Sequence, residues 1–179
     1  MREALSSGAG PALKVCLLDA IACPLRTRLR VLHDYASGGD SRETGRQSTF
    51  DPLHHARHKH LGILDAVGRR NVNALTLGWE GYLHPRWRLR VSHLDFWLAS
   101  RYDGFYGING RQAVVAPAGG AASNKIGSEW DLILRFATPI EGLSVEGGPG
   151  LFYPGGFLET HLGEFSKRKM VYLSIDFEL

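Results

Sequence analysis

The sequence has no long hydrophobic run. No apolar stretch in its 179 residues approaches the roughly 18 residues that a membrane-spanning helix requires. It also has little net charge, because 21 basic residues against 18 acidic ones leave only +3 at neutral pH. So small an excess suggests a mild preference for anions, and no nucleic-acid recognition motif accompanies it. We therefore expect neither a spanning helix nor a nucleic-acid partner.

Cysteine is scarce as well. Cys16 and Cys23 are the only two, and such a pair indicates neither a disulfide framework nor a metal site. They lie in a ragged N-terminal segment, residues 1–25, whose weakly apolar run is interrupted by Asp19. This segment makes a poor secretory signal. If the protein is exported, we expect its true signal to be missing from this chain.

What the sequence does contain is alternation of apolar and polar residues with a period of two, which is typical of strands with one apolar face. The residues Leu75, Leu77 and Trp79, for example, alternate with Thr76 and Gly78. We predict strands in six segments, which are residues 27–35, 75–83, 88–99, 128–137, 143–153 and 170–179. Residues 14–22 fit a seventh strand less well.

The segment 88–99 changes phase along its length. Leu89 and Val91 occupy one face, whereas Leu94, Phe96 and Leu98 fall on the other. A β-bulge inserts one residue and would bring these side chains back to the same face. We therefore predict a bulge near residues 92–93.

The links between these segments differ in length. Residues 84–87 and 138–142 are short and contain turn residues, whereas residues 37–70, 100–127 and 154–169 are long and mostly polar. Short turns at one end and long loops at the other are typical of outer-membrane β-barrels. The predicted fold class is all-β, with about six antiparallel transmembrane strands in a single region, residues 26–179.

The polar face of these strands carries most of the charge. An arginine on a lipid-facing position costs several kcal/mol near the bilayer centre, so these side chains are predicted to line a pore. The predicted basic lining is Arg28, Arg30, Arg88, Arg90 and Arg135, and the predicted acidic lining is Asp34, Glu80, Glu129, Asp131 and Asp176. Two roles stay open for the arginines, because they could attract an anionic solute or pair with the acids and stiffen the wall.

No motif points to catalysis, a metal or a cofactor. His54, His55, His58 and His60 follow no structural zinc spacing, and a solvated loop accounts for them better. No nucleophile elbow surrounds any serine, and the paired glycines match no phosphate-binding motif. We expect a protein that is not an enzyme and needs no cofactor.

Several segments, taken together, resemble the C-terminal part of the alginate export family of outer-membrane proteins. They are DYASGGD (34–40), TFDPL (49–53), HKHLGILDAVGRRNVNAL (58–75) and FWLASRYDGFYGINGR (96–111). Their order and approximate spacing agree with the family over about 145 residues. The resemblance implies a Gram-negative outer-membrane barrel that passes anionic polysaccharide or small anionic solutes through a basic pore. Outer-membrane lipid and periplasmic export or assembly machinery are the other implied partners.

The sequence departs from the family pattern in three respects. His54 and His55 replace an aromatic residue followed by proline, and Leu179 replaces a terminal aromatic residue. The family barrel also has on the order of 18 strands, the size class that leaves an aqueous channel. We therefore expect the chain to be a C-terminal fragment of a porin. The alternative is a small soluble β-sheet protein that binds a ligand between its strands.

Overall fold

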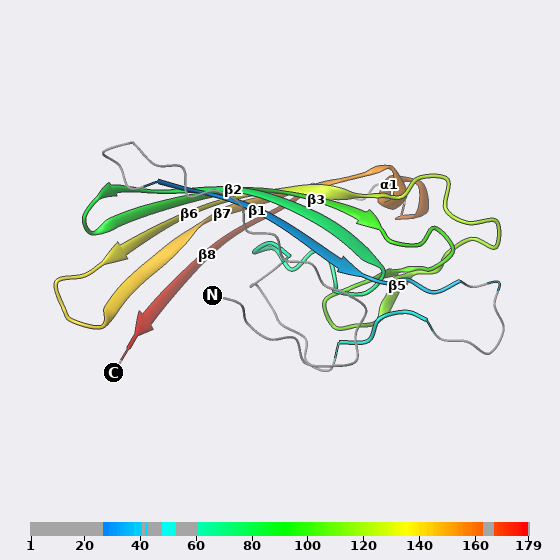
Figure 1. The fold of residues 1–179 in the computed structure, drawn as a ribbon, viewed down its shortest axis with the longest axis horizontal. Coiled ribbons are helices and arrows are strands. Elements are labelled where there is room, and N and C mark those ends of the chain that lie inside the picture. The colour runs from blue at the N-terminus through cyan, green and yellow to red at the C-terminus, as the bar shows by residue number, and fades with distance from the viewer. Residues whose placement is uncertain (1–26, 41, 43–47, 53–60, 163–166, 179) are drawn as a thin grey trace.

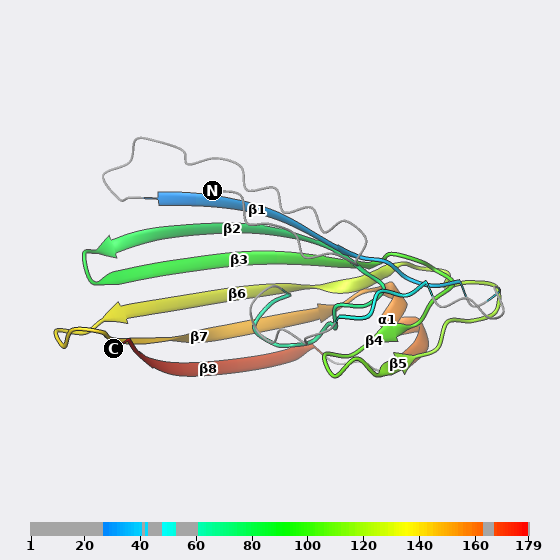
Figure 2. The same cartoon turned by 60° about the horizontal axis from the view of Figure 1, so that its bottom comes forward.

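The structure is a computed structural model and describes residues 27–40, 42, 48–52, 61–162 and 167–178. Six strands form one antiparallel sheet in which each strand pairs with the next along the sheet (Figure 2). They are β1 (Thr27–Ala36), β2 (Val72–His84), β3 (Trp87–Leu98), β6 (Lys125–Ala137), β7 (Leu143–Pro154) and β8 (Arg168–Phe177). The six predicted strands and the all-β class are confirmed. The strands are 10 to 13 residues long.

The short links lie at one end of the sheet and the long links at the other, as predicted (Figure 1). We call these the turn end and the loop end. The long links contain three elements that the sequence did not predict, namely β4 (Phe105–Tyr106), β5 (Gln112–Val114) and α1 (Gly156–Leu162). Each is too short to show a hydrophobic period.

The strand register gives the sheet two different faces. Trp79 lies opposite Val91, and Val91 lies opposite Leu132, so these three side chains share one face, the apolar face. Leu77 belongs to it too, because it is two residues from Trp79 on the same strand. The other face, which we call the charged face, carries the residues that alternate with these. The apolar face comprises Leu29, Val31, Leu77, Trp79, Val91, Trp130, Leu132, Val145, Leu151, Val171, Leu173, Ile175 and their neighbours of the same phase.

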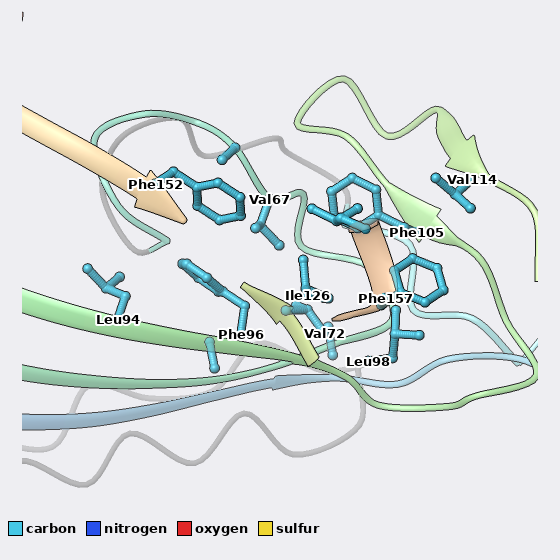
Figure 3. Packing of buried hydrophobic residues seen from close by; sticks show 14 of the residues in the cluster. Val67, Val72, Leu94, Phe96, Leu98, Phe105, Val114, Ile126, Phe152 and Phe157 are labelled. Carbon is cyan, nitrogen blue, oxygen red and sulfur yellow. The ribbon is translucent and has the colours of Figure 1, made fainter. Parts of the chain in front are cut away.

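The hydrophobic core lies on the loop end of the charged face. There Phe96 from β3 lies beside Phe152 from β7, and Phe157 from α1 belongs to the same cluster; all three side chains are fully or almost fully buried (Figure 3). Phe105 of β4 and Val67 of the loop that precedes β2 complete this cluster. Part of the long loops, residues 61–71, therefore folds back over the sheet, while other loop residues continue beyond its end (Figure 1).

This core explains the change of phase in β3, and the predicted bulge near residues 92–93 is wrong. Ser92 pairs with Gly78 and His93 pairs with Leu77 without any shift, and the register of β3 with β6 shifts only near Phe96 and Trp97. The strand keeps its alternation. Leu94, Phe96 and Leu98 lie on the charged face. They are apolar because the loops cover that face at the loop end and bury their side chains.

The sheet is open in the described part of the chain. The edge strands β1 and β8 each pair with one neighbour and not with each other, so these residues do not form a closed barrel. None of the described helices has the length and hydrophobicity needed to cross a membrane. Residues 1–25, including Cys16, Cys23 and the weak seventh strand, lie outside the described residues.

Candidate functional site

The charged face brings together every residue predicted to line a pore. Strand pairing places Arg28, Glu80 and Arg90 in one row across β1, β2 and β3. In the strand register, Arg88 of β3 lies opposite Arg135 of β6, and Asp176 of β8 lies opposite Ser144 of β7. The remaining members of the set, at the same phase of their strands, are Arg30, Asp34, Glu129 and Asp131. That they border a pore stays a prediction.

The turn end of this face contains an ion pair and an arginine that is hydrogen-bonded to a neutral side chain. Arg88 Nη1 lies 3.6 Å from Glu80 Oε1, and Arg135 Nη2 donates a hydrogen bond to Ser144 Oγ over 2.9 Å. The two roles left open for the arginines are therefore both compatible with the geometry. Glu80 pairs with Arg88, whereas Arg135 has a neutral partner in this bond.

Two further polar residues belong to this end of the face. The Tyr172 hydroxyl donates a hydrogen bond to Glu146 Oε1 over 2.7 Å. Both residues alternate with apolar neighbours in β7 and β8. The alternation that predicted the other charged-face residues could therefore have predicted these two as well. From the row that holds Arg30 and Asp131 to the turn end, arginines outnumber acids, namely Arg28, Arg30, Arg88, Arg90 and Arg135 against Glu80, Asp131, Glu146 and Asp176.

The loop end of the charged face is covered by residues 61–71, which we call the docked segment (Figure 2). The backbone N–H of Leu64 donates a hydrogen bond to Glu129 Oε1 over 3.0 Å. Gly62 allows this approach, since its φ is 87° and a Cβ there would lie 2.2 Å from Glu129 Oε1. Glu129 is fully buried and Asp131 nearly so. These two acids lie on the predicted face, but beneath the docked segment.

Arginines of the docked segment connect it to other elements. Arg69 pairs with Asp34 of β1, with 3.1 Å between Nη2 and Oδ2. Arg70 pairs with Asp51 and donates a hydrogen bond to the carbonyl of Gly110 over 2.9 Å. These contacts could not be predicted, because residues 61–71 have no strand or helix period.

Two buried polar side chains connect the loops to one another. Asp103 accepts hydrogen bonds from Gly39 N over 2.7 Å, from Thr49 Oγ1 over 2.6 Å and from the Tyr106 hydroxyl over 2.8 Å. Asn71 donates to the carbonyls of Ser100 and Gly104 and accepts from the backbone N–H of Ser100. We call Asp103, Asn71 and the residues that they bond the loop cluster.

The loop cluster is formed by the segments that carry the family resemblance. Gly39 comes from DYASGGD, Thr49 from TFDPL, Asn71 from GRRNVNAL, and Asp103 and Tyr106 from SRYDGFYG. The sequence marked these segments as a set but did not predict that they touch. Their shared role is to fix the loops over the loop end of the sheet.

Two groups in the loops have shifted pKa values. Burial, followed by the hydrogen bond to the Asp103 carboxylate, raises the pKa of the Tyr106 hydroxyl above its usual 10.0. At Asp40, hydrogen bonds from the Arg42 side chain and backbone lower the pKa of the carboxyl to about 2. Tyr106 therefore stays neutral and Asp40 stays ionised at neutral pH.

The histidine cluster cannot be placed, because residues 53–60 lie outside the described residues. Among the residues that are described, no group of three or more histidines, cysteines, aspartates or glutamates is arranged to hold a metal ion. The described residues therefore form a charged surface that loops partly cover.

Comparison with known proteins agrees with the motifs. Residues 21–172 match the model of the family described as alginate export, and this range includes five of the six strands, the start of β8, the docked segment and the loop cluster. No curated protein matches the chain.

Proposed function

We propose, because the chain belongs to the alginate export family, that its sheet is a section of the wall of an outer-membrane channel. The channel would pass anionic polysaccharide or small anionic solutes without chemical change. The observation that carries this proposal is the register, which collects exposed apolar side chains of six strands on one face and charged ones on the other.

The apolar face supports contact with lipid. Leu77 is 48% exposed, Leu132 is 43% exposed and Leu173 is 73% exposed, and similar side chains surround them on every strand. Soluble monomers rarely expose a continuous apolar patch of more than a few hundred Å². A lipid-spanning strand needs about 9–11 residues, and all six strands are long enough.

The charged face supports anion passage. Its arginines outnumber its acids at the turn end, and rings of basic residues lower the energy of an anion in a pore. The docked segment would narrow the passage at the loop end, where Glu129 holds Leu64. Since passage along such a surface needs no bond to be made or broken, we propose a transporter and not an enzyme.

A complete wall needs more strands than these six. In lipid, the unpaired backbone groups along the edges of β1 and β8 would each cost several kcal/mol. We propose that strands beyond those described here pair with both edges and close the barrel. The six strands would then be a part of the pore wall and not the whole pore.

Ion selectivity tests the role of the arginines. Channels isolated from outer membranes of cells expressing the chain would be compared in planar bilayers under a salt gradient. We expect Arg88→Glu/Arg90→Glu to shift the reversal potential from anion towards cation preference. The matched control, Arg86→Glu/Arg111→Glu, changes two exposed arginines outside the charged face and should leave it unchanged. An unaltered anion preference in the first variant would refute the role.

The soluble alternative makes a different prediction for the same chain. A soluble sheet would cover its apolar face, whereas in the described residues the loops pack on the charged face (Figure 1). After refolding in detergent, a barrel wall is expected to migrate differently on a gel before and after heating. A chain that is monodisperse without detergent and shows no such difference would favour the soluble ligand-binding protein.

A further inference from the structure

The apolar face ends, at the loop end of the sheet, in a row of lysines beside aromatic rings. Lys125 Nζ lies 4.1 Å from the centroid of the Trp97 ring, and Lys167 Nζ lies 5.1 Å from that of the Tyr153 ring. Lys169 follows on β8, opposite Leu151 of the apolar face. The row crosses β3, β6, β7 and β8, which are neighbours in the sheet (Figure 2).

Positive charge dominates this row. Lys125 pairs with Asp95, which also belongs to the apolar face. The described lengths of β7 and β8 have no acidic residue at the positions of this face, and Lys167 and Lys169 are both exposed. The excess charge therefore lies at Lys167 and Lys169, and the side chain of Tyr153 lies next to it.

The row lies at the distance along the strands at which the hydrocarbon layer of a bilayer would end. From Lys169, the same phase of β8 continues through Val171, Leu173 and Ile175, which are 68–78% exposed. The nine residues from Lys169 to Phe177 extend about 26 Å along a strand, and a tilted strand needs about 9–11 residues to cross a bilayer. The apolar band of an outer-membrane barrel is about 25 Å tall and is bordered by aromatic residues. The lysines therefore lie where lipid head groups begin.

We propose that this row, Trp97, Lys125, Tyr153, Lys167 and Lys169, binds the phosphates of lipid head groups in the leaflet at the loop end. The inference rests on the proposed function, since it needs the apolar face to contact lipid. Ammonium groups attract phosphate, and aromatic rings beside them favour the interface between head groups and acyl chains. Charge complementarity thus selects a phosphate-rich lipid over a zwitterionic one.

The test uses vesicles of phosphatidylcholine alone or doped with diphosphoryl lipid A. The full chain is refolded into each, insertion is scored by heat-modifiable migration, and lipid A retained after mild detergent extraction is quantified. We expect wild type to retain lipid A, and Lys167→Gln/Lys169→Gln to bind it roughly 25-fold more weakly, since each lysine at an anionic surface contributes about fivefold. The control Arg86→Gln/Arg111→Gln removes the same charge elsewhere and should bind like wild type.

The outcomes separate this inference from the proposed function. Insertion without enrichment of lipid A, or equal retention by both double variants, would overturn the inference alone. Displacement of lipid A by inorganic phosphate at equal phosphate concentration would also overturn it, because a free anion would then satisfy the lysines as well as a lipid does. Absence of the chain from the isolated outer membranes of cells that express it would overturn the proposed function and this inference together.

Discussion

The backbone N–H of Leu64 and the Oε1 atom of Glu129 form a 3.0 Å hydrogen bond that joins the docked segment to the charged face of the sheet. The Glu129 side chain is fully buried, whereas Arg135, on the same face of β6 near the turn end, is only half-buried. One acid of β6 therefore holds a loop in place over the surface on which we propose that solutes move.

Glu129→Ala is expected to loosen the docked segment. The buried N–H of Leu64 would lose its acceptor, at a cost of about 1–3 kcal/mol, so amide exchange in residues 61–67 should accelerate about 10- to 100-fold. Hydrogen exchange followed by mass spectrometry measures this directly. Glu129→Gln keeps a carbonyl acceptor and should restore protection. Glu146→Ala, whose bond is to Tyr172, should have no effect on residues 61–67, and equal protection in all variants would contradict the anchoring role.

Asn71→Ala is expected to destabilise the loop cluster. Asn71 is fully buried with φ of 48°, a conformation that asparagine tolerates better than alanine, and its amide bonds three backbone groups. We expect the free energy of unfolding to fall by about 3 kcal/mol, measured by urea titration in lipid vesicles. Asn109→Ala removes a single exposed bond to Arg111 N and should cost less than about 1 kcal/mol.

Gly38→Ala should displace the Asn71 side chain by a steric clash. A Cβ at Gly38 would lie 2.0 Å from Asn71 Oδ1, so the Asn71 side chain must move and lose its bonds. We expect a loss of about 1–3 kcal/mol. Gly119→Ala is the matched control, because a Cβ there meets nothing within 4 Å. In the double variant with Asn71→Ala the two losses should not add, and full additivity would refute the shared mechanism.

Tyr106 should make stability depend on pH in the alkaline range. Its pKa is raised in the folded state, so above the usual value of 10.0 the unfolded chain releases this proton first. The stabilisation that Tyr106 contributes to the folded state is fully present below pH 10. It is lost as the pH rises towards the higher pKa that Tyr106 has in the folded state. Tyr106→Phe should remove that part of the slope between pH 9 and 11, measured by urea titration at each pH. Identical slopes would contradict the raised pKa of Tyr106 in the folded state.

Strand alternation was enough to predict β6, where Trp130, Leu132 and Leu134 fall on one face and Glu129 and Asp131 on the other. The same rule misled in β3, because Phe96 and Leu98 are apolar for a reason that lies outside the strand, namely the loops that cover them. The contact of Gly39 with Asp103 spans 64 positions. No local period encodes such a pair, so the loop cluster emerges only once the fold is known.

Leu132→Arg should distinguish a membrane wall from a soluble sheet. Leu132 lies on the apolar face and is 43% exposed. If that face contacts lipid near the middle of the bilayer, an arginine costs about 2–4 kcal/mol of unfolding free energy in vesicles, whereas on a water-exposed sheet it costs little. Val115→Arg introduces the same charge at a loop position that is 73% exposed and should be tolerated in both cases. Equal stability of the two variants in vesicles would mean that water, and not lipid, covers the apolar face.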